Sequence, residues 1–433
     1  MQVTITALDQ EGRGIARLEG KAVFVEGALI GERVDIETLR RKPNYDLARV
    51  SAIHTASPSR VEPRCPHFGI CGGCSLQHLD APAQVAIKQR VLEDALWHIG
   101  RLEAQQILAP IHGSTWEYRH RARLSVRNVP KKGGVLVGFH EKRSSYVADM
   151  TSCAVLPARI SALLPELRGL IGRLSVRDRV PQIELAIGDD GDVTFDVLVL
   201  RHLAPLGEAD RRELSAFEQR HHVHFYLQAG GPDTARALST PSQPITYRLP
   251  DFNVVLEFDP TDFTQVNASV NRVLVRRAIA LLDPHPGEHV ADFFCGIGNF
   301  TLPIARRGAS VVGLEGSRAL VSRAEANAAR NGLSDRARFE SANLFEACRS
   351  GIETLGPFDK ALVDPPREGA IALVKALPEK RLERIVYVSC NPATLARDAA
   401  VLVHERGYAL RAAGIVNMFP HTAHVESIAV FEG

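Results

Sequence analysis

Cys390 and Glu426 are the two side chains of this sequence best placed to do covalent chemistry. Cys390 stands in YVSCNPATLARD, where an apolar run ends and a helix-forming stretch begins. A thiol at the end of a strand and next to a helix N-terminus is expected to favour the thiolate, which is the nucleophilic form. Glu426 in HVES begins another apolar run, where its carboxylate could act as a general base. Cys390 and Glu426 are therefore the candidate catalytic pair.

A glycine turn and a carboxylate predict a site for an adenosine-containing cofactor. The run HVADFFC predicts a strand that leads into Gly296 and Gly298, and Glu315 ends the next predicted strand in VVGLEG. Backbone amides at such a turn can face a ligand, and a carboxylate one strand away can bind both hydroxyls of a ribose. The third glycine of a dinucleotide motif and the lysine of a P-loop are missing from the sequence. We therefore expect S-adenosylmethionine, with a nicotinamide-binding fold as the alternative.

One reaction would use these parts together, namely methylation of uracil at C5. That carbon is a poor nucleophile, but a thiolate that adds across the C5–C6 double bond turns it into an enolate that can attack a methyl group. The C5 proton must then leave to a base, and elimination returns the cysteine. Asp364 in VDPPR could hold a ring N–H, and Gln265 in DFTQVN could contact the base or the cofactor. All of these groups must converge on one ring.

Four further cysteines have the spacing of a metal site. Cys65, Cys71 and Cys74 lie in RCPHFGICGGC, and Cys153 follows in MTSCAVLP. Three thiolates on one glycine-rich loop and a distant fourth could close a tetrahedral site. This spacing favours an iron–sulfur cluster over zinc, which more often uses two paired C-x2-C knuckles. A zinc site and buried, reduced cysteines remain the alternatives.

The elements that must position these residues fall into three predicted domains. Residues 1–54 alternate apolar and polar positions between glycine turns, which predicts a small β-barrel or a hairpin decoration. Residues 55–262 begin at a proline-rich boundary and combine a helix over 83–100 with strands between 118 and 200, so that an α+β domain is expected, possibly discontinuous. Beyond residue 263, strands alternate with helices, which predicts an α/β domain with a parallel sheet over 263–433.

The charge distribution points to a polyanionic partner. The whole chain carries a net charge of +2, but residues 55–153 hold 13 cationic against 8 anionic side chains. Arg119, Arg121 and Arg123 alternate in YRHRARLSV, so one face of a strand could contact phosphates, and a solvated edge strand is the alternative. The sequence has no apolar run of about 18 residues and no export signal at its start, so a cytoplasmic protein is expected.

The order of the motifs resembles a known family. DFTQVN, DFFCGIGNF, VDPPR, SCNP and HVES follow one another as in the RNA uracil-C5 methyltransferases, and the resemblance runs over nearly the full chain. CPHFGICGGC with Cys153 is similar to the four-cysteine [4Fe-4S] site of the iron–sulfur branch of that family. EGRGIAR, AVFVEG and GERV are similar to a TRAM domain. The combination resembles most closely the members that methylate 23S ribosomal RNA.

This resemblance implies a fold class and a set of site residues. The fold would be an α/β catalytic domain with a Rossmann-like class I methyltransferase sheet, preceded by an N-terminal small β-barrel (TRAM/OB-like) and a central iron–sulfur α+β domain. Cys390 would be the nucleophile and Glu426 the base. S-adenosylmethionine would be surrounded by Gln265, Phe294, Asn299, Glu315, Asn343 and Asp364. The [4Fe-4S] cluster would be held by Cys65, Cys71, Cys74 and Cys153.

The implied substrate is a uridine that leaves its stack in a loop of 23S ribosomal RNA, at uracil 1939, and becomes 5-methyluridine. Neither a membrane nor an obligate protein partner is expected. Three alternatives stay open: a related enzyme for another rRNA or tRNA uridine, an inert RNA-binding or redox-sensing protein with a metal site, and a radical enzyme that cleaves S-adenosylmethionine with its cluster. The radical class would need only three cysteine ligands, so Cys153 as a fourth ligand disfavours it.

Overall fold

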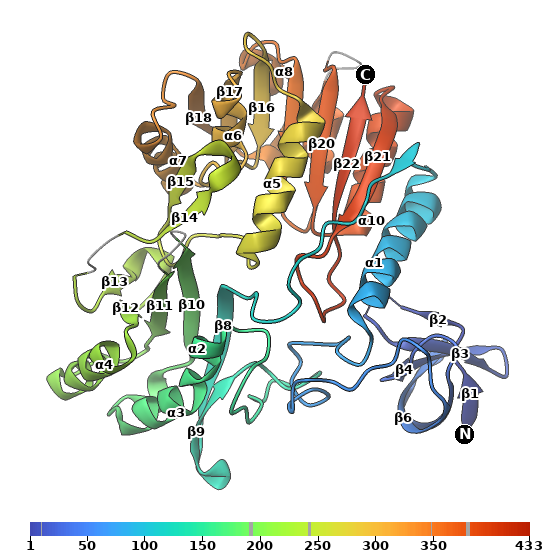
Figure 1. Ribbon diagram of the computed structural model, residues 1–433, viewed down its shortest axis with the longest axis vertical. Helices are drawn as coiled ribbons and strands as arrows, with labels where there is room; N and C mark the ends of the chain where they lie inside the picture. The colour runs from blue at the N-terminus through green and yellow to red at the C-terminus, as the bar shows by residue number, and fades with distance from the viewer. Residues whose placement is uncertain (10, 190–193, 241–243, 348, 378–381) are drawn as a thin grey trace.

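The computed structural model describes residues 1–9, 11–189, 194–240, 244–347, 349–377 and 382–433 and folds them around three β-sheets. Figure 1 shows the N-terminal sheet at one end of helix α1 (Ala81–Ala95), the second sheet beside it, and the third sheet above both, with the C-terminus. Each sheet has its own buried apolar cluster, and the third sheet has one on each face. Three sheets, each with its own buried cluster, suit a chain of 433 residues.

The N-terminal sheet has six strands in the order β1-β5-β6-β4-β3-β2. Alternate residues of its strands, such as Val23 and Val25, are buried, while their neighbours are partly exposed, as the alternating sequence predicts. The buried carboxylate of Glu32 accepts hydrogen bonds from Arg60 at 2.5 and 2.8 Å, which ties the sheet to the next segment. The strands are β1 (Gln2–Thr4), β2 (Ala7–Leu8), β3 (Gly14–Leu18), β4 (Lys21–Glu26), β5 (Arg33–Arg41) and β6 (Tyr45–Thr55).

The central sheet is mixed, with the order β13-β12-β11-β10-β14-β15, and β8 and β9 extend it from β10. Helix α3 packs on β9 through leucines at helical spacing, among them Leu163, Leu167 and Leu170. The strands are β8 (Arg121–Val129), β9 (Gly134–Gly138), β10 (Gln182–Asp189), β11 (Thr194–Arg201), β12 (His224–Gln228), β13 (Arg236–Ala237), β14 (Thr246–Leu249) and β15 (Val254–Glu257). The helices are α2 (Ala158–Ser161), α3 (Leu163–Arg173) and α4 (Glu208–His221).

The third sheet confirms the predicted α/β domain. Its order is β18-β17-β16-β19-β20-β22-β21-β7, parallel from β18 to β20, with β22 antiparallel to both of its neighbours. The chain reverses direction across the sheet between β16 and β19, where open α/β sheets bind their ligands. The strands are β7 (Gln106–Ile107), β16 (His289–Phe293), β17 (Ser310–Glu315), β18 (Ala337–Ser341), β19 (Lys360–Val363), β20 (Arg384–Ser389), β21 (Ala409–Val416) and β22 (Glu426–Glu432).

Both faces of this sheet are buried, which explains the continuous apolar runs in its strands. Along β19, for example, Leu362 packs in the cluster on one face, and Ala361 and Val363 pack in the cluster on the other. The helices that cover the two faces or flank them are α1 (Ala81–Ala95), α5 (Ala268–Leu282), α6 (Thr301–Arg306), α7 (Arg318–Arg330), α8 (Arg349–Thr354), α9 (Ile371–Ala376) and α10 (Pro392–Ala400). In the described part of the chain, none of the helices has the length and apolarity to cross a bilayer.

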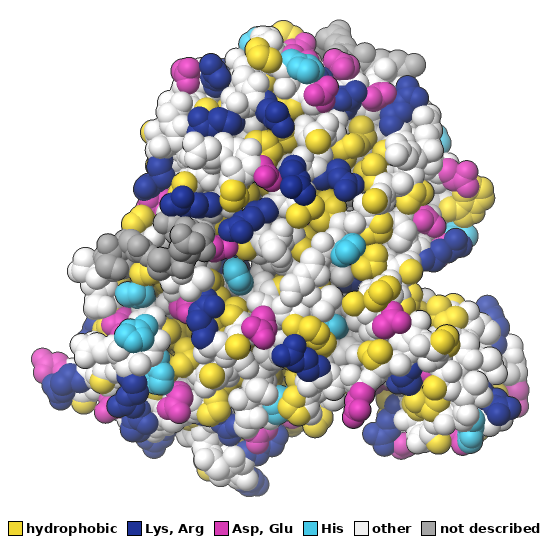
Figure 2. Space-filling view, viewed as in Figure 1, with side chains coloured by type: hydrophobic (Ala, Val, Ile, Leu, Met, Phe, Trp, Pro, Cys, Tyr) yellow, Lys and Arg dark blue, Asp and Glu magenta, His cyan; other side chains and the backbone are white. Residues whose placement is uncertain are grey.

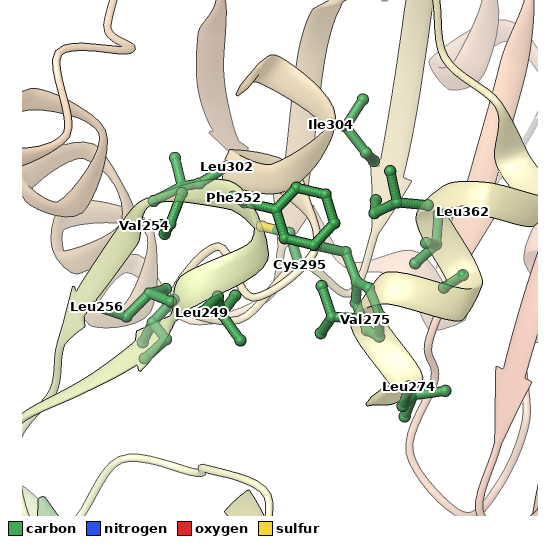
Figure 3. Packing of buried hydrophobic residues seen from close by; sticks show 14 of the residues in the cluster. Leu249, Phe252, Val254, Leu256, Leu274, Val275, Cys295, Leu302, Ile304 and Leu362 are labelled. Carbon is green, nitrogen blue, oxygen red and sulfur yellow. The ribbon is translucent and has the colours of Figure 1, made fainter. Parts of the chain in front are cut away.

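Three elements from the first part of the chain pack against the third sheet or its helices. Helix α1 lies against α10 and β21, and β7 pairs in parallel with β21. The turn of the hairpin β14–β15 packs on α5, as Figure 3 shows for the ring of Phe252 beside Val275. Residues that precede position 263 in the sequence thus reach the sheet edge where the predicted active site lies.

The central domain differs from the prediction in its metal site. Cys65, Cys71, Cys74 and Cys153 do line one cavity, but its volume is about 20 Å³, which is room for about one water molecule. Among the described residues, no group of three or more His, Cys, Asp or Glu side chains is arranged to hold a metal ion. Burial raises the pKa of Cys71 to about 11 and that of Cys74 to about 12. The prediction of a central iron–sulfur domain is therefore wrong, and the four cysteines are free thiols.

Candidate active site

The predicted catalytic and cofactor residues line one cavity of about 470 Å³ at the carboxyl ends of the parallel strands. Its volume lies in the range of small-molecule sites. The sequence-predicted residues among its walls are Gln265, Phe294, Asn299, Glu315, Asn343, Asp364, Cys390 and Glu426. The topology explains this meeting, because most of these side chains follow or begin neighbouring strands of the third sheet.

Cys390 follows the last residue of β20 and precedes α10. The side chain of Asn391 caps this helix by accepting a hydrogen bond from the Ala393 N–H at 3.1 Å. Burial raises the pKa of the Cys390 thiol to about 11, and the negative charges of Glu426 and Asp364 add to the effect. The expectation that the helix N-terminus would favour the thiolate is therefore wrong here, because burial and two carboxylates outweigh it.

Glu426 is the first residue of β22 and lies opposite Val416 on β21. Its side chain is almost fully buried, and its Oε2 atom has no hydrogen-bond partner among the described residues. Burial raises its pKa to about 8, the charge of Asp364 adds to this, and the charge of Lys88 opposes it. A carboxylate with a pKa near the working pH and with free lone pairs can take up or release a proton.

Asp364 follows β19, the strand beside β20. Its backbone N–H donates to the Phe293 carbonyl at 3.2 Å, which fixes the position where β19 ends and the VDPPR motif begins. Burial raises the pKa of its carboxyl group to about 7. Asp364, Cys390 and Glu426 thus stand at the ends of three adjacent strands, β19, β20 and β22. The two buried carboxyl groups of Asp364 and Glu426 lie near the Cys390 thiol.

Glu315, Phe294 and Asn343 form the side of the cavity at β16, β17 and β18. The Glu315 carboxylate accepts hydrogen bonds from the Gly296 N–H at 3.2 Å and from the Ser317 N–H at 3.0 Å, one on each oxygen. Each oxygen therefore keeps a lone pair for a ligand hydroxyl. The ring of Phe294 packs edge-on against Phe345, with 5.7 Å between their centroids, and offers an apolar wall.

Tyr247 is a cavity residue that the sequence did not indicate. It lies on β14, and its hydroxyl donates to Asn299 Oδ1 at 3.0 Å. Asn271 on α5 donates to the same oxygen at 3.0 Å and accepts from Asn299 Nδ2 at 3.1 Å. No motif marks Tyr247, because its contact with Asn299 depends on how the β14–β15 hairpin packs on α5.

A family model described as tRNA (Uracil-5-)-methyltransferase matches residues 83–432. The chain belongs to this family. A second model, the TRAM domain, matches residues 1–50, in agreement with the predicted N-terminal domain.

Individual members of the uracil-5-methyltransferase family cover the chain almost completely. Proteins from Aromatoleum aromaticum and Nitrosospira multiformis are each 61% identical to it and align with 99% of this chain and 98% of their own. Both carry the name 23S rRNA (uracil(1939)-C(5))-methyltransferase RlmD. A solved structure, the Pyrococcus abyssi tRNA (uracil-54, C5)-methyltransferase in complex with S-adenosyl-L-homocysteine, matches all of both chains with a TM-score of 0.75 at 26% identity.

As in a uracil-5-methyltransferase, the cavity must hold S-adenosylmethionine, and its residues fit that group. Glu315 offers carboxylate lone pairs for a ribose, and Phe294 and Phe345 offer apolar surfaces for an adenine. The amide of Asn299 borders the same space. The polar groups are few and converge on an otherwise apolar cavity, as is usual for cofactor sites.

Cys390 also borders a second cavity. This cavity, of about 430 Å³, is lined by Cys390 and Arg367 and by Arg13 and Phe24 of the N-terminal sheet. A third cavity, of about 550 Å³, lies between all three domains, and Arg13 lines it as well. Cys390 is therefore reached from the cofactor side and from the side of the TRAM domain.

The three arginines expected to bind RNA make different contacts within the protein. Arg119 lines the 550 Å³ cavity and lies over the Phe139 ring, at 5.6 Å from its centroid. Arg121 donates to the carbonyls of Pro260 and Asp262, both at 2.7 Å, so its guanidinium is used inside the protein. Arg123 forms an ion pair with Glu184 at 3.0 Å.

Other basic side chains occupy the outer surface. Figure 2 shows Lys and Arg side chains gathered on one face over α5, a helix that carries Arg272, Arg276 and Arg277. Arg272 pairs with Asp189 at 2.7 Å and Arg276 lies 3.7 Å from Asp251, so part of this charge is balanced within the protein.

Proposed function

We propose that this protein transfers the methyl group of S-adenosylmethionine to C5 of uracil 1939 in 23S ribosomal RNA and produces 5-methyluridine. The observation that carries the proposal is the meeting of Cys390, Glu426 and the adenosyl-binding residues in one cavity. Relatives named for this reaction align with nearly the whole chain at 61% identity, which supports the choice of target.

In this proposal Cys390 is the nucleophile. Its sulfur adds to C6 of the uracil, which enters from the side of the TRAM domain, where a cavity borders the thiol. The thiol is protonated at neutral pH, so the addition needs help toward the thiolate. Arg367, which borders both cavities at Cys390, is the cation that lowers the pKa of this thiol. Asp364 holds a ring N–H of the base and keeps it in the plane required for attack.

Glu426 is the general base that removes the C5 proton after methylation. Loss of this proton gives back the C5–C6 double bond and expels the Cys390 sulfur. When bound, S-adenosylmethionine supplies the methyl group. Glu315 holds the ribose, Asn343 and Phe294 contact the adenine, and Gln265 and Asn299 contact the remainder of the cofactor.

RNA binding is assigned to the N-terminal and central domains. Arg119 and Arg13 line the cavity between the domains and can contact phosphates there. Arg121 and Arg123 are retained as weaker candidates, because both are engaged by protein groups. We assign residues 1–54 to the TRAM β-barrel, 55–262 to the central domain and 263–433 to the methyltransferase domain, and we place the protein with its ribosomal substrate in the cytoplasm.

The test is methyl transfer from tritium-labelled S-adenosylmethionine to a 23S ribosomal RNA fragment that contains uracil 1939. We expect labelled RNA with the wild-type protein and none with Cys390→Ala or with a fragment that carries cytosine at position 1939. The same assay is run with transfer RNA as the substrate. If the transfer RNA becomes labelled and the ribosomal RNA does not, the target is a tRNA uridine instead. No transfer to either RNA would refute the proposed function.

A further inference from the structure

The segment that leads into Glu426 is an irregular connection. Residues 417–425, all of them described, join β21 to β22 without a helix or strand of their own, and Glu426 begins β22. Phe419 and His424 of this segment line the 550 Å³ cavity between the domains, and His424 also lines the 430 Å³ cavity at Cys390. A segment without ladder hydrogen bonds needs other groups to satisfy and fix its backbone.

A buried glutamine of α1 holds the middle of this segment. Gln84 is 0% exposed, and its Oε1 atom accepts a hydrogen bond from the His421 N–H at 2.8 Å. Its Nε2 atom donates to the carbonyls of Leu76 at 3.0 Å and Leu79 at 2.8 Å. The Leu76 N–H in turn donates to the His421 carbonyl at 2.9 Å. The Gln84 amide thus takes the place of a peptide unit and closes a ring of three hydrogen bonds with Leu76 and His421.

The backbone conformation of His421 depends on such contacts. Its φ angle is +64°, in the left-handed region that residues with a side chain seldom adopt. Its ring stacks on Trp116, with 3.8 Å between the centroids and 26° between the planes. A conformation of this kind persists where the surroundings fix it, and such positions cluster at functional sites. Gln84, which lies 337 residues earlier in the chain, is one of the residues that fix it.

Neighbouring residues of the segment are held from the same direction. One turn further along α1, Lys88 donates to Asn417 Oδ1 and to the Phe419 carbonyl, both at 2.8 Å. The Tyr118 hydroxyl donates to the Pro420 carbonyl at 3.0 Å. Gln84 differs from these two donors because its single side chain joins α1, the loop that contains Leu76 and the segment itself.

Cys390 is fixed by a different set of contacts. Ser389 Oγ accepts a hydrogen bond from the Asn391 N–H at 3.2 Å, and the Asn391 side chain caps α10. Loosening of residues 417–425 should therefore disturb the base more than the nucleophile. In the proposed reaction Cys390 acts before methyl transfer and Glu426 acts after it, so that the two effects can be measured separately.

We propose that Gln84 is a positioning residue for the general base: through His421 it fixes the segment that presents the Glu426 carboxylate to the C5 proton. This inference rests on the proposed function, because it concerns the step after methyl transfer. In that step the proton passes from C5 to Glu426, the C5–C6 double bond forms again, and the electron pair of the C6–S bond returns to the Cys390 sulfur. Displacement of a catalytic group by about 1 Å can slow a step about 100-fold.

The test uses Gln84→Met, which keeps the length of the side chain but can neither accept from His421 nor donate to Leu76. A single turnover is followed with saturating RNA that carries tritium at C5 of the target uridine, and with S-adenosylmethionine labelled in its methyl group with a second isotope. Tritium release should slow about 10- to 100-fold, whereas transfer of the methyl group to the RNA should keep nearly the wild-type rate. A denaturant-resistant protein–RNA adduct should therefore accumulate.

A second variant and a control separate positioning from folding. His421→Gly permits the left-handed backbone but removes the ring that stacks on Trp116, so it should also accumulate the adduct, and it decides the test if Gln84→Met does not fold. Gln228→Met removes another buried glutamine, on β12, which lines neither cavity at Cys390, and it should behave like wild type.

Two results would overturn the inference. The first is wild-type tritium release in the folded variants, and the second is an equal slowing of methyl transfer and tritium release, which indicates general damage to the site. Failure of the wild-type protein to methylate the RNA would instead refute the proposed function.

Discussion

Replacement of Tyr247 by phenylalanine should weaken cofactor binding although Tyr247 is not expected to react. Its hydroxyl and the Asn271 amide both donate to Asn299 Oδ1, so the two acceptor positions of that oxygen are used. Asn299 Nδ2 donates once to Asn271 at 3.1 Å, which leaves one N–H for a ligand. Asn299 can therefore act only as a donor toward the cofactor, and Tyr247 helps to hold the amide in this orientation.

The expected size of the effect follows from the loss of one hydrogen bond. A buried hydrogen bond of this kind contributes about 0.5–1.5 kcal/mol, which corresponds to about a 2- to 13-fold change in Kd. The lower part of this range is expected, because Asn271 still holds the Asn299 oxygen. Calorimetric titration of wild type and Tyr247→Phe with S-adenosylhomocysteine measures the change directly.

Tyr226→Phe is the matched control for this experiment. Tyr226 lies on β12 of the same sheet, and it is not among the residues that line the cofactor cavity. The Tyr226→Phe protein should bind S-adenosylhomocysteine with the wild-type Kd. A Tyr247→Phe protein that melts at the wild-type temperature and also keeps the wild-type Kd would refute the assigned role of Tyr247.

Two other substitutions test the base and the packing of the sheet. Glu426→Gln should accumulate a denaturant-resistant protein–RNA adduct, because the C5 proton cannot leave. In wild type, release of the adduct should become faster as the pH rises through about 8, since only the ionised carboxylate accepts the proton. Gel electrophoresis after denaturation measures the amount of adduct in both experiments. Gly414→Ala should destabilise the protein by about 1–3 kcal/mol, because the added Cβ would lie 2.7 Å from the Cβ of Leu108 and 2.9 Å from its carbonyl oxygen; urea unfolding measures this, and an unchanged midpoint would contradict it.

The catalytic sheet could be predicted from the sequence because its strands are buried on both faces. Each strand is a short apolar run that ends in polar residues, as in β19, which stops just before Asp364, and in β20, which stops just before Cys390. Parallel strands bring such ends to one edge, so local patterns sufficed to assemble the cavity residues. The sequence patterns predicted the site well because the ends of the strands and the motifs that carry its residues coincide in the sequence.

Residues that reach the site through tertiary packing could not be predicted in this way. Lys88 contacts Asn417 from a position 329 residues earlier in the chain, and Tyr247 contacts Asn299 from a different sheet. The alternation of Arg121 and Arg123 predicted a shared strand face, but not that Arg121 would donate to carbonyls within the protein. Spacing likewise brought the four cysteines together without showing that the cavity between them is small.

The same distinction applies to the electrostatics of the site. The helix N-terminus beside Cys390 is a local feature, and by itself it would lower the pKa of the thiol. Burial, Glu426 and Asp364 come from the assembled sheet edge and raise that pKa to about 11. Carboxyl groups with pKa values of about 7 and 8 crowd this edge, so the protonation state of the site depends on the few cations that reach it. Lys88 comes from α1, before the catalytic sheet in the sequence, and it reaches the segment that leads into Glu426 because α1 packs on β21.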